Sequence, residues 1–432
     1  MTVIAEIGTA HQGSLSKAKE LIDAACEAGA DAVKFQWVYA DEILHPETGF
    51  VSLPGGSVRL YDRFKALEVS PQFFADCASY AHQRGALFIC SPFGIRSLQE
   101  LLAIKPDAVK IASPEINHIP LLRALAASRL EQAQGVPVII SSGVSTLSDI
   151  ETALRILRTG AERTAGTGEK STDTASAGSI HAPDGAATRA DSTHTAGAGA
   201  NSIRTVGAPD SELSAGAGTK LPPLTLLHCI TSYPAPESEY NVRLLSTLHA
   251  IFGVATGISD HSLDPVLVPV LSCAMGGTMI EKHITLSKKT DGLDDPVALE
   301  PEQFAYLCFC VRQCMAAFRQ YGEEGGRRTI IAQMEEQYGK EKVQVVLGDG
   351  VKRLAKSEQE NYGRTNRSLH FMRALKQGDT LHKADIGVLR TEKVLTPGIS
   401  PLFLDAVIGA RLTHDVASGE GVQWTQLITQ GK

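Results

Sequence analysis

Short apolar stretches rich in Val and Ile recur along the chain, and each is bounded by Gly, Pro or Asp. Stretches of this length and composition between turn residues predict buried strands. Eight are found, at residues 3–7, 32–35, 86–90, 108–111, 138–140, 224–229, 254–258 and 278–281. Apolar residues at helical spacing fill the intervals, as at 15–27, where Leu21, Ile22 and Ala25 share one face. Further helices are expected at 71–84, 121–127, 147–157 and 304–318.

Strands that alternate with helices pair in parallel through right-handed crossovers. Eight such units are the number that closes a (β/α)8 barrel of the triosephosphate isomerase type. A doubly wound open sheet is the competing architecture, but it usually carries a glycine-rich phosphate loop after its first strand, and no such loop follows residues 3–7. The pattern therefore predicts an α/β fold with a TIM barrel.

The periodic pattern divides the chain into a catalytic barrel at 1–322, a polar connector at 323–362 and a small β-rich domain at 363–432. The last region repeats a strand, glycine turn and strand phrase around Gly378 and Gly419. The barrel is interrupted at about 159–221, where 39 of the 60 residues from 161 to 220 are Ala, Gly, Ser or Thr. Such a composition buries too little apolar area to order itself, so we expect a disordered surface insertion.

Composition narrows the functional classes. The net charge of −7 and the pI near 6.0 argue against a general nucleic-acid-binding protein. No apolar run is long enough for a membrane span, and the N-terminus carries no export pattern, which favours a cytoplasmic protein with reduced cysteines. Cys308, Cys310 and Cys314 cluster in one expected helix, where we interpret them as small apolar residues rather than a metal site.

Polar side chains stand at the end of nearly every expected strand. The active site of a β/α barrel lies at the carboxyl ends of its strands, so these residues are the candidates for chemistry. They are Glu6, Lys34, Gln36, Ser91, Lys110, Ser113, Glu115, Ser141, His228, Thr231, Tyr233, Ser259, Asp260, His261, Glu281, Lys282 and His283. A barrel mouth that served only stability would not need so many reactive groups.

Two subsets of these residues suggest a chemistry. Lys34 and Lys110, with serines between them, suit a small anion that carries phosphate or carboxylate. His261 and His283 follow neighbouring strands, whose axes lie about 4.8 Å apart, so their imidazoles are close enough to share one metal ion. Nitrogen and oxygen ligands leave Mn²⁺, Co²⁺, Zn²⁺ and Mg²⁺ all open.

At these residues the chain resembles the sialic acid synthase family, whose members make nonulosonic acids from phosphoenolpyruvate. The matching phrases are AEIGTAHQG, GADAVKFQ, ICSPF, VKIASPE, VIISSGVSTL, LLHCITSYPAP, GISDHSLD and IEKHITL. The C-terminal region, with LRTEKVLTPGISP, is similar to the antifreeze-like SAF domain (a β-clip fold) of these enzymes. Together the similar segments cover nearly everything outside the insertion and the connector.

The resemblance implies a role for each matching residue. Lys34, Lys110, Glu115 and His283 are expected to be catalytic. Phosphoenolpyruvate is expected to contact Lys34, Ser91, Lys110, Ser113, Ser141, Thr231 and Ser259. The acceptor sugar is expected to contact Glu6, Gln36, Tyr233, Asp294 and Arg390. A divalent metal ion, with Mn²⁺ expected and Mg²⁺ or Co²⁺ as alternatives, is assigned to His261 and His283.

The implied reaction joins phosphoenolpyruvate to an open-chain 2-acetamido sugar such as N-acetylmannosamine and releases phosphate by C–O cleavage. A diacetamido trideoxyhexose of the legionaminic or pseudaminic route is the alternative acceptor, because residues 290–296 differ from the family's common PGPDH pattern. The resemblance also implies a domain-swapped homodimer, in which the SAF domain covers the partner's barrel mouth.

Three other functions fit parts of the pattern. A class I aldolase would form a Schiff base on Lys110 or Lys282. A non-catalytic sugar-binding paralogue would have lost some of the lysines, serines and histidines, and all of them are present. A 3-deoxy-sugar-phosphate synthase would need a further basic site for the phosphate of its acceptor.

Overall fold

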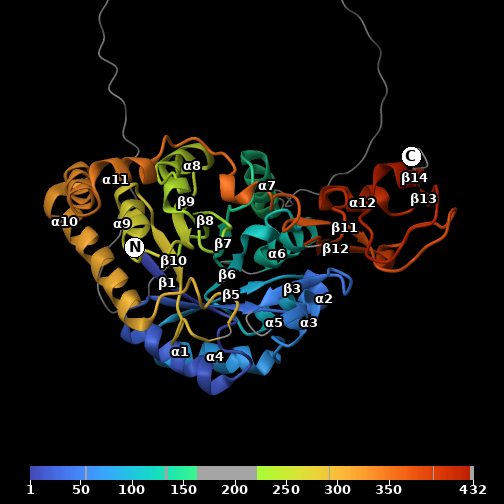
Figure 1. Cartoon of the computed structure of the whole chain (residues 1–432), viewed down its shortest axis with the longest axis horizontal. Coiled ribbons are helices and arrows are strands. Elements are labelled where there is room, and N and C mark those ends of the chain that lie inside the picture. The colour runs from blue at the N-terminus through green and yellow to red at the C-terminus, as the bar shows by residue number, and fades with distance from the viewer. Residues whose placement is uncertain (54–55, 132–134, 163–220, 291, 393, 429–432) are drawn as a thin grey trace, which may run out of the picture. The chain divides into compact units, whose positions relative to one another are not determined.

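The computed structural model describes residues 1–53, 56–131, 135–162, 221–290, 292–392 and 394–428. Eight parallel strands close into a barrel in the order β1-β10-β9-β8-β7-β6-β5-β2 (Figure 1). They are β1 (Thr2–Gly8), β2 (Ala32–Trp37), β5 (Leu87–Pro92), β6 (Ala108–Ile111), β7 (Val138–Ser141), β8 (Leu224–Cys229), β9 (Ala255–Asp260) and β10 (Met279–His283). The predicted TIM barrel is confirmed, and each strand lies where the apolar pattern placed it.

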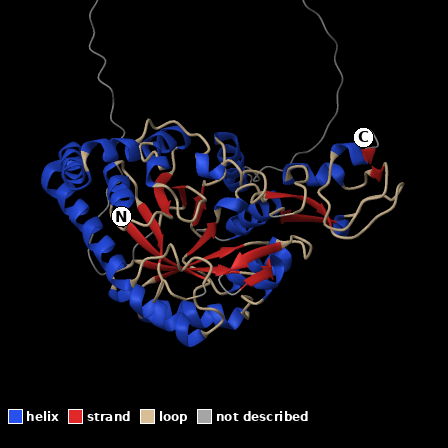
Figure 2. Ribbon diagram, viewed as in Figure 1, coloured by secondary structure: helices blue, strands red, loops and turns tan. Residues whose placement is uncertain are grey.

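Helices surround the strands on the outside of the barrel (Figure 2). They are α1 (Leu15–Glu27), α4 (Pro71–Gln83), α5 (Ile95–Ala103), α6 (Ile119–Glu131), α7 (Leu147–Glu162), α8 (Leu244–Phe252), α9 (Leu267–Ala274) and α10 (Pro301–Tyr338). Helices α1 and α4 begin with serine caps, Ser14 and Ser70, whose hydroxyls accept a backbone N–H of the first turn. Helices α5, α8 and α9 were not among the helices expected from the sequence. Helix α9 is buried on every side and so lacks a polar face.

The interior of the barrel contains an apolar layer and, above it, a polar layer. A separate apolar cluster includes Ile4, Ala32, Ile89, Ala108, Ile139, Leu227 and Met279 from neighbouring strands. Side chains two positions apart on a strand point to the same face. The residues two positions further along are therefore directed into the barrel above this cluster: Glu6, Lys34, Ser91, Lys110, Ser141, Cys229 and Glu281. The apolar layer therefore lies directly below the polar residues of the barrel mouth.

The connection from β2 to α4 is longer than the other strand-to-helix connections and has structure of its own. It contains two short helices, α2 (Ala40–Ile43) and α3 (Leu60–Lys65), and an antiparallel hairpin of β3 (Phe50–Leu53) and β4 (Gly56–Arg59). The sequence pattern did not predict this hairpin. Its strands are only four residues long, which is too short for a clear alternation of apolar and polar positions.

The segment expected as a connector is largely helical in its first half. Helix α10 continues beyond Gly322, whose φ of 70° marks a kink, and is followed by α11 (Lys340–Leu347). Ile330 and Met334 are buried against the barrel core, so this stretch belongs to the packed helical layer. The insertion expected at 159–221 lies almost wholly outside the described residues. Its first residues are described, because α7 extends to Glu162.

The C-terminal region forms a small β domain with its own apolar core, which includes Leu369, Phe371 and Val422. It contains β11 (Arg367–Phe371), β12 (Ile386–Arg390), β13 (Arg411–Leu412) and β14 (Leu427–Ile428). The two similar glycine phrases pair with each other through an antiparallel bridge between Leu375 and Val416. The expected β-rich domain is thus present. None of the described helices has the length and apolarity that a membrane span requires.

Candidate active site

A cavity of about 390 Å³ lies at the carboxyl ends of the barrel strands. All but two of the residues to which the family resemblance assigned a role line it. These are Glu6, Lys34, Gln36, Lys110, Ser113, Ser141, Thr231, Tyr233, Ser259, His261, His283, Asp294 and Arg390. The two exceptions are Ser91 and Glu115, which are fully buried beside it. The barrel therefore brings together residues that span most of the chain.

The two lysines meet over one buried carboxylate. Lys110 Nζ lies 2.5 Å from Glu281 Oε2, and Lys34 Nζ lies 3.9 Å from the same oxygen. Lys34 also pairs with Glu6, its register partner on β1. Although burial favours a neutral carboxyl, the two ammonium groups lower the pKa of Glu281 to about 2. Glu281 therefore stays ionised and holds both lysines in the cavity.

Burial also changes the pKa of one of these lysines. It lowers the pKa of Lys34 to about 8, against the attraction of Glu281, because the charged ammonium loses its hydration. An anionic ligand beside Lys34 would restore part of that lost stabilisation. The cavity thus contains Lys110, which is paired with Glu281, and Lys34, whose charged form an anionic ligand would stabilise.

Hydroxyl groups lie beside Lys34 and Lys110 and form with them the part of the cavity most suited to an anion, which we call the anion-binding edge. The side-chain oxygens of Ser141 and Thr231 are buried and have no hydrogen-bond partner within the described protein, and both residues line the cavity. Ser259 donates to Glu281 at 2.9 Å, and Ser91 accepts from Lys34 at 3.4 Å. Two free hydroxyl donors beside two lysines can satisfy the oxygens of a phosphate or carboxylate.

His261 and His283 face the cavity side by side, with ring centroids 5.6 Å apart. Nδ1 of His261 donates to the carbonyl of Ile230 at 2.8 Å, which puts the lone pair of the neutral ring on Nε2. Burial lowers the pKa of His283 well below its usual value and keeps that ring neutral. Burial lowers the pKa of His261, but the Cys229 thiol beside the ring raises it overall. An unprotonated His261 together with the neutral His283 would offer two nitrogen ligands to one metal ion.

Two further groups border the histidine pair. Asp294 Oδ2 lies 3.9 Å from His283 Nδ1. The ring of Tyr233 stacks on His261 with centroids 4.2 Å apart, and its hydroxyl lies 3.3 Å from His261 Nε2. No group of three His, Cys, Asp or Glu side chains suited to a metal occurs in the described part of the chain. An ion held by the two imidazoles would keep coordination positions open, as catalytic sites require.

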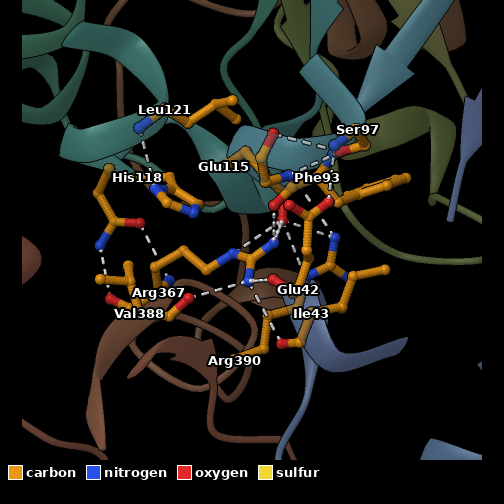
Figure 3. A network of polar contacts seen from close by, with 12 residues as sticks. Glu42, Ile43, Phe93, Ser97, Glu115, His118, Leu121, Arg367, Val388 and Arg390 are labelled. Carbon is orange, nitrogen blue, oxygen red and sulfur yellow. Dashed lines mark hydrogen bonds and ion pairs between the residues drawn. The ribbon is translucent and has the colours of Figure 1, made fainter. Parts of the chain in front are cut away.

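Glu115 is bonded to two arginines from the C-terminal domain (Figure 3). Its Oε1 accepts from Arg367 Nη2 at 2.8 Å and from Arg390 Nη2 at 2.9 Å. The guanidinium of Arg367 is completely buried and also donates to the carbonyls of Phe93, Glu42, Ile43 and Val388. Sequence reasoning did not single out Arg367, because nothing in a five-residue strand distinguishes a buried arginine from a solvated one.

Lys282 lies outside the cavity, although it sits between two cavity residues on β10. Its ammonium contacts Asp260 Oδ2 at 2.5 Å and donates to the carbonyls of Ser262 and Asp264. Side chains alternate along a strand, so Glu281 and His283 point inward while Lys282 points away. It fastens the loop after β9. His228 is likewise directed elsewhere, with Nε2 bonded to the carbonyl of Tyr240 at 2.6 Å.

The fold and the site together define a class: a (β/α)8 barrel with a C-terminal β domain, whose mouth holds a cationic, hydroxyl-rich edge beside two imidazoles. The NeuB family model matches residues 21–323, and the SAF domain model matches residues 366–428. The chain therefore belongs to the NeuB family and carries a C-terminal SAF domain. Relatives of this chain include synthases of N,N'-diacetyllegionaminic acid, pseudaminic acid and N-acetylneuraminate 9-phosphate.

Individual relatives agree with this assignment over nearly the whole chain. The chain is 27% identical to the N,N'-diacetyllegionaminic acid synthase of Legionella pneumophila over 98% of its own length and 94% of that protein. It is also 27% identical to the spore coat polysaccharide biosynthesis protein SpsE of Bacillus subtilis, over 99% of this chain and 93% of that protein. The crystal structure of that protein superposes with a TM-score of 0.70 at 24% identity, covering 100% and 96% of the two chains.

Proposed function

We propose that this chain is a metal-dependent nonulosonic acid synthase that condenses phosphoenolpyruvate with the open-chain aldehyde of an acetamido sugar. The observation that carries the proposal is the cavity itself. Lys34, Lys110 and the unpartnered hydroxyls of Ser141 and Thr231 form one edge, and His261 and His283 form another. An enol phosphate and an aldehyde need these two environments next to each other.

The anion-binding edge supplies the binding and charge stabilisation in this proposal. Lys34 and Lys110 hold the carboxylate and phosphate, which compete with Glu6 and Glu281 for the two ammonium groups. Carbon 3 of phosphoenolpyruvate attacks the aldehyde carbon, and water adds to carbon 2 of the resulting oxocarbenium. The C–O bond to phosphate then breaks, and the lysines stabilise the leaving dianion. The products are a 2-oxo sugar acid and inorganic phosphate.

A divalent cation fits the histidine pair on grounds of charge as well as ligand chemistry. The lysine, arginine and acidic side chains that line the cavity balance one another in formal charge: Lys34, Lys110 and Arg390 against Glu6, Glu281 and Asp294. Phosphoenolpyruvate carries both a carboxylate and a phosphate, so its binding requires further positive charge. A metal ion held by His261 and His283 would supply that charge and polarise the aldehyde oxygen as a Lewis acid. Mn²⁺ is the ion we propose, with Mg²⁺ or Co²⁺ as alternatives.

The identity of the acceptor is the finer part of the proposal. The relatives include synthases of diacetyllegionaminic acid and of pseudaminic acid from Campylobacter jejuni. These relatives favour a diacetamido trideoxyhexose over N-acetylmannosamine. We expect Tyr233, Gln36 and Asp294, which line the cavity, to contact the hydroxyl groups of either sugar. Arg390 would need to leave Glu115 in part to reach an acetamido oxygen.

The deciding experiment measures phosphate release from phosphoenolpyruvate by the full chain with Mn²⁺, across a panel of amino-sugar aldehydes. Diacetamido trideoxyhexoses should give the highest kcat/KM, and mass spectrometry should detect the corresponding nonulosonic acid. Release that depends on N-acetylmannosamine alone would leave the synthase proposal standing and overturn the acceptor preference. No sugar-dependent release with any acceptor would overturn the synthase proposal.

The domain-swapped homodimer stays a prediction, since Arg390 and Glu115 meet here within a single chain. Mixing two inactive variants, Lys34→Met and Arg390→Ala, provides the test. A swapped dimer should regain activity, because some mixed dimers contain one cavity with both residues intact. If each cavity is completed by its own chain, the mixture should stay inactive.

A further inference from the structure

The segment that joins α11 to the C-terminal domain places one carboxylate against two loops at the edge of the cavity. Glu358, at the end of the short helix Lys356–Glu358, is 1% exposed. Its Oε1 accepts the backbone N–H of Thr231 at 2.7 Å and that of Val144 at 2.8 Å. These two N–H groups belong to the loops that follow β8 and β7. Glu358 therefore ties two neighbouring barrel loops together from outside the barrel.

The two loops that Glu358 joins carry the unpartnered hydroxyls of the anion-binding edge. Ser141 ends β7 three residues before Val144, and Thr231 supplies both the bonded N–H and a free hydroxyl. Gly143 shows how closely the groups approach. A Cβ at this position would lie 2.2 Å from Thr231 Oγ1, 2.8 Å from Ser113 Oγ and 3.2 Å from Glu358 Oε1. Only glycine fits where these oxygens converge.

A carboxylate at this position needs an explanation, because burying one is costly unless its partners are good. Among the ion pairs of the described residues, none includes Glu358, so backbone donors are its main partners. Lys352 of the same segment donates to the carbonyl of Ser142 at 3.0 Å and so holds the β7 loop at a second point. A segment that merely linked two domains would have no need of these contacts.

We propose that Glu358 is a positioning residue that fixes the phosphate-binding edge of the cavity, holding Thr231 and the 141–144 loop at the separation one phosphate group requires. The proposal rests on the proposed function, because it takes phosphoenolpyruvate as the anion. Without Glu358, the N–H groups of Val144 and Thr231 would be left unsatisfied or would turn toward solvent. Either change would move the hydroxyls away from the phosphate, since binding sites depend on preorganised donors.

Three variants of the full chain test this assignment. Glu358→Ala removes the hydrogen bonds from the N–H groups of Thr231 and Val144, and the weaker one from Ala355. Glu358→Gln keeps an acceptor oxygen for the Thr231 and Val144 N–H groups and removes the charge. Ser357→Ala is the matched control, because Ser357 is the neighbouring residue and bonds Glu239 rather than the cavity loops. The readouts are the KM for phosphoenolpyruvate, the KM for the sugar, kcat, the dissociation constant of phosphoenolpyruvate by calorimetry, and the thermal midpoint.

We expect Glu358→Ala to weaken phosphoenolpyruvate binding by about ten-fold or more, the scale for leaving buried donors unpaired, with the KM for the sugar nearly unchanged. Glu358→Gln should recover most of the affinity, and Ser357→Ala should bind as the wild type does. Equal losses for both substrates, or no recovery in Glu358→Gln, would overturn the assignment. A wild-type chain that binds phosphoenolpyruvate without turnover would refute the proposed function alone, because the calorimetric comparison would still test Glu358.

Discussion

Arg367 Nη2 donates to Glu115 Oε1 at 2.8 Å, and neither side chain is exposed to solvent. Glu115 follows strand β6 of the barrel, whereas Arg367 begins strand β11 of the SAF domain. The ion pair therefore connects the two domains at the rim of the cavity. Arg390, which lines the cavity, shares the same carboxylate, so the position of Glu115 and that of Arg390 depend on each other.

Replacing Arg367 by Met should destabilise the protein strongly. The change leaves Glu115 with one guanidinium instead of two and leaves several buried carbonyls unpaired, and breaking a buried ion pair costs about 3–5 kcal/mol. The denaturant midpoint should fall accordingly. Arg364→Met provides the control, because Arg364 is exposed and lies three residues away. A normal midpoint for Arg367→Met would contradict the anchoring role.

Phosphoenolpyruvate should bind more weakly at high pH. Because the pKa of Lys34 is lowered to about 8, its ammonium is neutralised above that pH, and kcat/KM for phosphoenolpyruvate should decline. Lys34→Met should have a low kcat/KM with no such decline. A pH–rate profile from pH 6 to 10 gives the measurement, and a profile that is flat to pH 10 in the wild type would refute the assignment to Lys34.

The same shift has a consequence for stability. Between pH 8 and the ordinary lysine value, the unfolded chain binds more protons at this position than the folded chain does. Stability from Lys34 therefore rises with pH across this window, because the cost of burying a charged ammonium disappears. Denaturant titrations at pH 8 and 10 should show this rise in the difference between the wild type and Lys34→Met.

Removal of either imidazole should weaken metal binding. His261→Ala and His283→Ala should each reduce the affinity for Mn²⁺ by more than about ten-fold, a loss seen even for groups outside the ligand set. Calorimetry or competition with a chelating dye checks this without any need for turnover. His82→Ala is the control, because His82 is exposed and pairs with Asp107 far from the cavity. Unchanged affinity in both variants would place the metal elsewhere.

Borohydride should not trap a Schiff base on this protein. Lys110 and Lys282 form buried ion pairs with Glu281 and Asp260, each at 2.5 Å, and a nitrogen engaged in this way is not free to attack a carbonyl. Intact-mass measurement after treatment with pyruvate and borohydride should show no adduct, while a class I aldolase treated in parallel should be labelled. An adduct on Lys110 would revive the aldolase alternative.

The sequence by itself determined the barrel, because each strand needs a short apolar run and each helix needs an apolar face, and both patterns are local. It also determined which residues stand at the strand ends. Glu6, Lys34, Lys110 and Glu281 could therefore be expected at one mouth. Lys282 and His228 were expected there too, and only the structure shows that they are directed elsewhere. Short elements without a periodic signal, such as the β3–β4 hairpin, could not be found in this way.

Only the tertiary structure decided which polar groups are partners. Glu115 and Arg367 are 252 residues apart in sequence, and Thr231 and Glu358 are 127 apart. No local pattern relates such residues, because their contact depends on how the barrel closes and on where the connecting segment returns. A buried arginine and a buried glutamate look like solvated surface residues in a sequence, and only the packed chain removes the water that would otherwise surround them.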